Sequence, residues 1–175
     1  MSTKTKILVA NRGEIAIRII RAIQELKHEA VAVYETPDHQ SRHIRIANEA
    51  VWIGDGPRSD YLNIDKVIKA AKRAGATAIH PGYGFLAENP LLAKACEESG
   101  ITFIGPSSDV IEKLGNKVTA RRIMADAGIP MVPGTQNLSA GETGLEQARE
   151  FAEKYGYPLM LKATAGGGDR ILLTE

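Results

Sequence analysis

The sequence contains one cysteine among its 175 residues, Cys96, so no disulfide can form within the chain. Cys96 follows Leu91, Leu92 and Ala95 in a helical run, and we interpret it as a small core residue rather than a nucleophile. No apolar run approaches the roughly 18 residues of a membrane span, and the polar start carries no secretory signal. We therefore expect no membrane association and a reducing, cytoplasmic location.

An excess of charge of one sign is also missing. The chain has 22 basic and 21 acidic residues, which gives a formal net charge of +1. Without a broad positive field, nucleic acid is not an expected partner. Hydrophobic residues make up 43 % and charged residues 25 %, which is typical of a folded soluble protein.

Short apolar runs alternate with amphipathic helical segments over the first two thirds of the chain. The predicted strands are Lys6–Ala10, Ala30–Tyr34, Ala50–Ile53, Ala78–His80 and Ile101–Ile104. The connections between them are too long for hairpins, so the pattern indicates an α/β fold with a doubly wound parallel sheet, covered on both faces. Asn63 and Asn89 are predicted helix N-caps, and Gly75 a helix end.

The alternation ends near Pro106, and the remaining elements indicate a second region. Two helices are expected at Asp109–Leu114 and Lys117–Ala127, and a third begins at a capping box formed by Thr143 and Glu146. A strand at Leu159–Ala163 and a run at Ile171–Thr174 could then pair as a hairpin. We divide the chain into a domain over residues 1–115, a helical linker over 116–135 and an incomplete subdomain over 136–175.

In a doubly wound sheet, ligands bind beyond the carboxyl ends of the strands. The first strand is followed by N-R-G-E at Asn11–Glu14 instead of a G-x-G-x-x-G dinucleotide signature, and no P-loop is present. The four histidines are scattered, and each is interpreted as a surface residue or a structural residue with satisfied hydrogen bonds.

The glycine-rich turn after the strand that carries Lys162 could cradle a phosphate, or could be a mobile hairpin tip. Lys117 could equally be a solvated lysine near a helix start. In the Pro81–Asn89 loop, Tyr83 and Glu88 could serve only packing and solvation. On the first helix, the polar residues could form a solvated face or a subunit contact.

The order of the motifs along the chain resembles that of biotin carboxylases. From about Lys6 to Gly168 the sequence carries I-L-V-A-N-R-G-E-I-A-I-R, H-P-G-Y-G-F-L-A-E-N, F-I-G-P, G-N-K-V-T, G-Y-P and K-A-T-A-G-G-G. The resemblance implies a Rossmann-like pre-ATP-grasp domain followed by the start of an ATP-grasp lid subdomain. Enzymes of this family use MgATP to activate bicarbonate and then carboxylate biotin on a carrier protein.

The resemblance also implies roles for individual residues on the nucleotide side. Lys117 would contact ATP at its phosphates or near the adenine, and Lys162 would hold the α and β phosphates. Gly166, Gly167 and Gly168 would belong to the lid loop that closes over the triphosphate. Positioning and charge neutralisation are the main devices of phosphoryl transfer, so these residue types suit the chemistry.

On the other side of the site, Tyr83 would approach the biotin ring, and Glu88 would organise the loop around it. Arg18, Arg21 and Glu25 match the positions that the family uses for its dimer contact. The implied partners are a second copy of the chain, a biotin carboxyl carrier protein or domain, and a carboxyltransferase.

The sequence departs from the family where Asp169 follows Gly168, because the family has a further glycine at this point of the lid loop. In the family, the Mg²⁺ ligands and the catalytic residues lie in a later part that these 175 residues do not include. We therefore expect this chain alone to be inactive.

The resemblance does not choose between a subunit of acetyl-CoA carboxylase, which serves fatty acid biosynthesis, and a domain of a pyruvate or propionyl-CoA carboxylase. Two alternatives to the biotin carboxylase interpretation also remain. One is a non-enzymatic dimerisation module without a ligand site, and the other is a different ATP-grasp carboxylate ligase.

Overall fold

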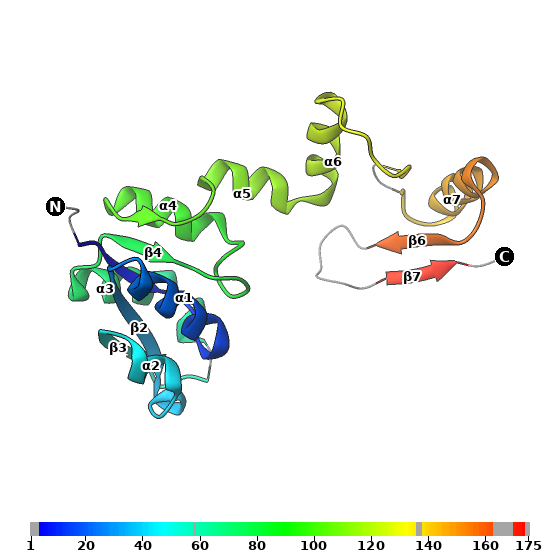
Figure 1. The fold of residues 1–175 in the computed structure, drawn as a ribbon. Coiled ribbons are helices and arrows are strands. Elements are labelled where there is room, and N and C mark those ends of the chain that lie inside the picture. The colour runs from blue at the N-terminus through cyan, green and yellow to red at the C-terminus, as the bar shows by residue number, and fades with distance from the viewer. Residues whose placement is uncertain (1–3, 58, 136–137, 163–169, 174–175) are drawn as a thin grey trace. The chain divides into compact units, whose positions relative to one another are not determined.

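The computed structural model describes residues 4–57, 59–135, 138–162 and 170–173, and the chain divides into two compact units, Met1–Glu112 and Lys113–Glu175 (Figure 1). The first unit holds the parallel sheet and its helices. Its elements are, in chain order, β1 (Lys6–Val9), α1 (Gly13–Glu25), β2 (Glu29–Glu35), η1 (Thr36–Asp38), α2 (Arg42–Ile46), β3 (Glu49–Gly54), η2 (Asp60–Leu62), α3 (Ile64–Ala74), β4 (Ala78–His80), α4 (Pro90–Glu98) and β5 (Thr102–Phe103), followed by α5 (Ser108–Gly115).

The five strands of the first unit form one sheet in the order β3-β2-β1-β4-β5, and every neighbouring pair is parallel. The doubly wound arrangement predicted from the sequence is therefore confirmed. The chain first moves outward from β1 to β3 and then crosses to β4 on the other side of β1. The switch point of the sheet accordingly lies between the carboxyl ends of β1 and β4.

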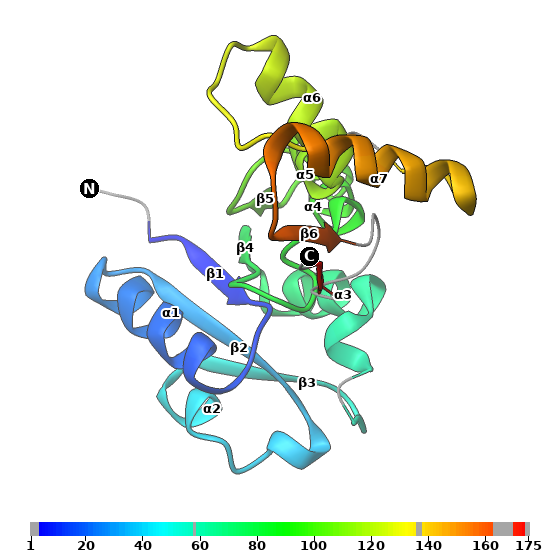
Figure 2. The ribbon, with the colours of Figure 1, turned by 90° about the vertical axis from the view of Figure 1, so that its right-hand side faces the viewer.

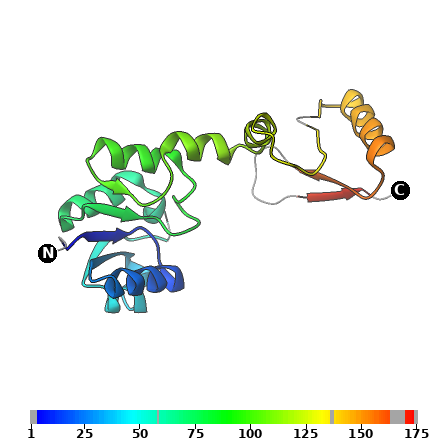
Figure 3. The same ribbon diagram turned by 45° about the horizontal axis from the view of Figure 1, so that its top comes forward.

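Alternate residues of β1 face two separate apolar layers. Ile7 and Val9 pack with Ile20 of α1 in one cluster, which partly buried side chains of α2 complete. Leu8 points the other way and belongs to the cluster that contains Val67 of α3 and Leu92 of α4. Figure 2 shows α1 and α2 beside the strands β1–β3. Figure 3 shows α1, in blue, on one side of the sheet, and α3 and α4, in teal and green, on the other. The sheet is thus covered on both faces, as expected.

The predicted caps of the first unit are confirmed. Asn63 accepts a hydrogen bond from the Lys66 amide at 3.1 Å, and Asn89 accepts one from the Leu91 amide at 2.9 Å. Gly75 ends α3 in the left-handed conformation, with a φ of 66°. These local signals fix where α3 and α4 begin and end, and so fix the length of the loop that precedes α4.

The second unit contains α6 (Lys117–Asp126), α7 (Glu142–Tyr155) and the strands β6 (Leu159–Lys162) and β7 (Arg170–Leu173). The two strands pair antiparallel, so the expected hairpin is confirmed. The predicted capping box is wrong, because α7 begins one residue before Thr143 and its N-cap is Gly141, which has no side chain to accept a hydrogen bond. Gly141 has a φ of 73°, a conformation that glycine adopts most readily.

The described helices of the second unit bury few side chains. No residue of α6 is buried, and α7 buries only Gly144 and Ala152. Val132 is 80 % exposed, and Leu145 and Met160 are about half exposed. Among the described residues, both hydrophobic core clusters lie in the first unit.

Cys96 provides a test of the packing on the α3–α4 side of the sheet. Its side chain is fully buried, and burial raises the pKa of the thiol to about 11. Because the thiolate is the reactive form, we expect alkylation by iodoacetamide at about pH 8 to be at least about 100-fold slower in the folded chain than in the unfolded chain. Mass spectrometry of timed samples, with and without guanidinium chloride, measures the two rates. Equal rates would contradict this packing.

Candidate functional site

The candidate site lies at the carboxyl end of the sheet, where the loop after β1 meets the loop after β4. Asn11 follows β1, is fully buried, and donates hydrogen bonds from Nδ2 to the carbonyl oxygens of Pro81 and Tyr83, both at 2.9 Å. Its Oδ1 accepts the Arg12 amide at 2.9 Å. The Asn11 amide therefore bridges the switch point, where a doubly wound protein commonly binds its ligand.

The loop over residues 81–89 has a backbone that its sequence makes possible. Gly82 has a φ of +69°, and a Cβ there would lie 2.8 Å from Asn11 Nδ2 and 2.9 Å from Cγ2 of Ile15, so a larger residue does not fit. The Gly82 amide donates to Nδ1 of His80 at 3.0 Å. Phe85 is also left-handed, with a φ of 43°, which is a strained conformation for a residue with a large side chain.

This loop places Tyr83 on the surface, with 66 % of the residue exposed. The Tyr83 hydroxyl lies 3.5 Å from Oε1 of Glu14, in the first turn of α1. The tyrosine backbone is thus held by a buried amide while its ring faces solvent. Such a ring is available to a ligand that binds at the rim of the sheet.

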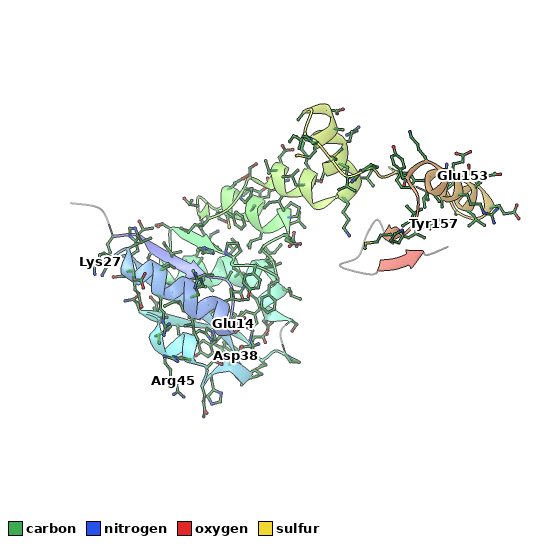
Figure 4. The ribbon with its side chains drawn as sticks, turned by 45° about the vertical axis from the view of Figure 1, so that its right-hand side comes forward. Glu14, Lys27, Asp38, Arg45, Glu153 and Tyr157 are labelled. Carbon is green, nitrogen blue, oxygen red and sulfur yellow. The ribbon has the colours of Figure 1, made fainter. Side chains whose placement is uncertain are left out.

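Asp38, at the end of η1, is the centre of a second cluster. Its side chain is only 6 % exposed and pairs with the Arg12 guanidinium through both carboxylate oxygens, with 2.7 Å between Arg12 Nε and Oδ2. The Tyr61 hydroxyl donates to Oδ2 at 2.7 Å, and the Ser41 hydroxyl donates to Oδ1 at 3.2 Å. Figure 4 marks Asp38 and Glu14 in the same unit.

The charges of this cluster are fixed by its hydrogen bonds. The bond from Arg12 lowers the pKa of the Asp38 carboxyl to about 2, although burial opposes the shift. Burial and the bond to Asp38 raise the pKa of the Tyr61 phenol well above its ordinary value. Asp38 is therefore an ionised acceptor and Tyr61 a neutral donor over the whole physiological pH range.

The loop between β3 and α3, which carries Tyr61, has its own buried support. Oε1 of Glu35 accepts the amides of Asp60 at 2.8 Å and Tyr61 at 3.3 Å. Asp60 accepts the Gly56 amide at 3.1 Å and forms an ion pair with Lys66. The ring of Tyr61 then stacks on Phe85, with ring centroids 5.4 Å apart and an angle of 24° between the planes.

His43 corrects the interpretation of the histidines as surface or satisfied residues. It lies in α2, is fully buried, and its Nε2 donates to the Val33 carbonyl at 3.2 Å. Its Nδ1 is buried and has no hydrogen-bond partner among the described residues. Burial lowers the pKa of His43, the bond to Val33 and the charge of Asp38 oppose this shift, and the charge of Arg12 adds to it.

The residues predicted on α1 lie together on its solvent side. Arg18, Arg21 and Glu25 are all exposed, while Ile20 and Ile23 of the same helix are buried. Their separation from the apolar stripe therefore agrees with the sequence. Their role in a dimer contact stays a prediction.

The predicted site residues outside α1 lie on several elements. Glu88 is exposed in the same loop as Tyr83, and its role in organising the loop stays a prediction. Asn11 and His80 both form hydrogen bonds with the backbone of this loop. Lys117 is exposed at the first position of α6, and Lys162 is the last residue of β6, in register with Arg170. The remaining predicted positions lie outside the described residues; they are Gly166, Gly167 and Gly168.

The start of α6 carries a residue type that suits the phosphates of MgATP. Asn116 caps α6 by accepting the amides of Val118 and Thr119, both at 3.0 Å, which leaves Lys117 as a cation at a helix N-terminus. A lysine ammonium is a side-chain group that binds phosphate, so Lys117 at the start of α6 fits a polyphosphate. In the described ranges, no group of three or more His, Cys, Asp or Glu side chains could hold a metal ion.

No helix in the part of the chain that the structure describes is long and apolar enough to cross a membrane.

The fold and site define a Rossmann-like pre-ATP-grasp domain followed by the start of an ATP-grasp lid. Residues 3–111 match the family "Biotin carboxylase, N-terminal domain", and residues 116–171 match "Carbamoyl-phosphate synthase L chain, ATP binding domain". The chain belongs to the biotin carboxylase N-terminal domain family.

Curated relatives match this chain over nearly its whole length. The biotin carboxylase of Halalkalibacterium halodurans is 52 % identical over 93 % of this chain and 36 % of its own length, and biotin carboxylase 1 of Bacillus subtilis is 51 % identical over 94 % and 36 %. Biotin carboxylase of Campylobacter jejuni, solved as a β-γ-ATP complex, has a TM-score of 0.88 at 40 % identity, with 98 % of this chain and 38 % of that chain covered.

A further solved structure is the biotin carboxylase domain dimer of the Hydrogenobacter thermophilus 2-oxoglutarate carboxylase, in complex with MgADP, ADP and bicarbonate. It has a TM-score of 0.85 at 48 % identity, and the match covers 96 % of this chain and 37 % of that chain. The chain thus spans little more than a third of the length of these relatives.

His43 predicts a pH dependence of stability. In the folded chain the pKa of His43 lies below its ordinary value of 6.5. Below pH 6.5 the unfolded chain therefore binds a proton at His43 more readily than the folded chain does. The free energy of unfolding falls as a result. His80, whose pKa burial also lowers, adds a contribution of the same sign. We expect His43→Leu to reduce the loss of stability between pH 6.5 and about pH 5 in urea titrations.

The matched control is His39→Leu, which replaces an exposed histidine and keeps His43, so this variant should still lose stability below pH 6.5 through His43. A His43→Leu variant whose stability falls with pH as steeply as that of the unchanged chain would contradict a buried, neutral His43.

Proposed function

We propose that this chain is the N-terminal part of a biotin carboxylase. The intact protein would use MgATP and bicarbonate to carboxylate biotin on a carrier protein. The observation that carries the proposal is the exposed Tyr83, whose backbone Asn11 holds at the rim of the sheet in a chain of this family. An aromatic ring with an adjacent carboxylate, Glu14, suits a flat, polar heterocycle such as the ureido ring of biotin.

For the nucleotide side, we propose that Lys117 and Lys162 contact the phosphates of ATP. Gly166, Gly167 and Gly168 would give the lid loop the backbone freedom to close over them. When bound, MgATP supplies the phosphoryl group that activates bicarbonate. What this part of the chain does is to hold and neutralise phosphate charge, since the Mg²⁺ ligands are expected in the rest of the protein.

The proposed partners follow from the same assignment. The biotin carboxylase domain of the 2-oxoglutarate carboxylase was solved as a dimer, and we propose that Arg18, Arg21 and Glu25 contribute to such a contact here. A biotin carboxyl carrier protein or domain, a carboxyltransferase and a cytoplasmic location complete the proposal. The domain boundaries at residues 115 and 135 also belong to it.

A dimerisation module without a ligand site is the rival of another class, and the exposed polar face of α1 would suit it. A different ATP-grasp carboxylate ligase is the second rival, because residues 116–171 match a family named for carbamoyl-phosphate synthase. Binding of MgATP distinguishes the proposal from the dimerisation module. Dependence on biotin distinguishes it from another ATP-grasp ligase.

The first test is calorimetric titration of the 175-residue chain with MgATP. We expect weak binding, with a Kd of about 0.1–1 mM, and about a tenfold loss in Lys117→Ala and in Lys162→Ala, because each removes a charged phosphate contact. Lys154→Ala, at an exposed position of α7, is the matched control and should bind as the unchanged chain does. ADP release with bicarbonate and biotin should stay at background. Absence of heat would favour the dimerisation module.

The second test restores the missing part. Residues 1–162 of this chain replace the matching segment of biotin carboxylase 1 of Bacillus subtilis, and bicarbonate-dependent ATP hydrolysis is measured with free biotin. We expect activity, and in Tyr83→Ala about a tenfold higher KM for biotin with the KM for MgATP within about twofold, since a lost ring contact weakens binding of that substrate alone.

Lys94→Ala, an exposed change on α4, is the control for the chimera. A folded chimera without turnover would contradict the proposed function. A KM for biotin that Tyr83→Ala leaves unchanged would contradict the assignment of this loop to the biotin side.

A further inference from the structure

We propose that Asp38, Tyr61 and Phe85 form a positioning chain that sets the conformation of the loop over residues 81–89 and thereby places Tyr83. The inference rests on the proposed function, in which Tyr83 lies on the biotin side. None of the three residues is a candidate ligand contact. They act through the backbone that carries Tyr83.

Arg12 anchors the positioning chain at one end. It directly follows Asn11, the residue that bridges the switch point. Arg12 pairs with Asp38 through both carboxylate oxygens, and Asp38 also accepts the hydroxyl hydrogens of Ser41 and Tyr61. The side chain of Asp38 is 6 % exposed, so it must keep these donors to remain ionised in a buried place. Its position is therefore fixed by donors from three separate segments.

Tyr61 carries this constraint from Asp38 to the 81–89 loop. It is 1 % exposed, its hydroxyl is held at 2.7 Å from Oδ2 of Asp38, and its amide is held by Oε1 of Glu35 at 3.3 Å. Tyr61 is thus held at its backbone and at the end of its side chain. These two contacts fix the orientation of the ring, on which Phe85 stacks.

Phe85 converts the stack into a backbone constraint. Its φ of 43° is one that residues with large side chains rarely adopt, so the conformation persists only where surrounding contacts hold it. Its ring stacks on Tyr61 and packs against the cluster that contains Leu8 and Leu92. Phe85 lies two positions after Tyr83, so its left-handed turn determines how the loop leaves the tyrosine.

Asn11 holds the other side of the same loop through Pro81 and Tyr83. The two supports differ in kind, because Asn11 binds carbonyl oxygens before and at Tyr83, whereas the stack fixes the residues after it. Loss of the positioning chain should therefore loosen residues 84–89 while the sheet and the Asn11 bridge remain.

Amide hydrogen exchange of the full 175-residue chain, measured by NMR, tests this. The reporters are the amides of Ala87 and Asn89, which donate to Gly84 and Leu86 within the loop at 2.9 and 3.1 Å. The amides that pair β1 with β2 report global unfolding. Tyr61→Phe removes one oxygen and keeps the ring, and Tyr155→Phe at an exposed position is the matched control.

In Tyr61→Phe we expect the loop amides to exchange about tenfold faster while the strand amides change by less than about twofold. A merely structural role would accelerate both sets by the same factor, and that result would overturn the proposal. Unchanged exchange at both sets would also overturn it. The control should leave both sets as in the unchanged chain.

Phe85→Gly is the second variant, because it relieves the strained φ and removes the stacked ring. The positioning chain predicts faster loop exchange in this variant, since the ring is what holds the loop. Exchange as slow as in the unchanged chain, or slower, would show that the stack does not set the loop and would overturn the proposal. This outcome can be read even if Tyr61→Phe fails to fold.

The chimera separates this inference from the proposed function. Exchange is measured without biotin or nucleotide, so its outcome does not depend on what the loop binds. In the active chimera, Tyr61→Phe should raise the KM for biotin several-fold and leave the KM for MgATP unchanged. A selective change in loop exchange without any change in the KM for biotin would retain the positioning chain and reject the biotin side.

Discussion

The first unit depends on keeping one buried carboxylate ionised. Asp38 can carry its charge away from water only because Arg12, Ser41 and Tyr61 all donate to it. These donors come from the loop after β1, the segment after η1, and η2 after β3. A single acceptor therefore holds together the ends of three connections, and removal of one donor leaves the others around an incompletely satisfied charge.

The position of Asn11 explains why this doubly wound sheet departs from a dinucleotide-binding one. Its amide bridges the switch point, so the Gly82 and Tyr83 backbone is drawn against the sheet and the Tyr83 ring is displayed at the rim. The proposed phosphate contacts belong instead to the second unit, where Lys117 begins α6 and Lys162 ends β6. The proposed biotin-side contact and the proposed phosphate contacts thus lie in different units of the chain.

Local patterns predicted the fold well and the support of the site poorly. Ala78–His80 is a strand as expected, Asn63 and Asn89 cap their helices, and Cys96 is in the core, because each depends on residues near it in sequence. The Thr143 capping box failed because Gly141 supplied a backbone conformation that began the helix earlier.

The contacts that hold the loop join residues far apart in sequence. Asp38 and Tyr61 are 23 positions apart, and Asn11 and Tyr83 are 72 apart, so no periodicity reveals them. The N-R-G-E motif marked Asn11 as a place to look, but a short polar motif does not state its partner. His43 was hidden in the same way, since a polar-looking helix gives no sign that this side chain is buried.

The N-R-G-E segment and the H-P-G-Y-G-F-L loop are mechanically joined through Asp38 and Tyr61. Arg12 and Phe85 stand at the two ends of this connection, and the residues between them transmit any coupling. A double-mutant cycle of Arg12→Met and Phe85→Leu, from urea unfolding of the four chains, measures that coupling directly. We expect an interaction free energy of at least about 0.5 kcal/mol, and additivity within about 0.3 kcal/mol would contradict this connection.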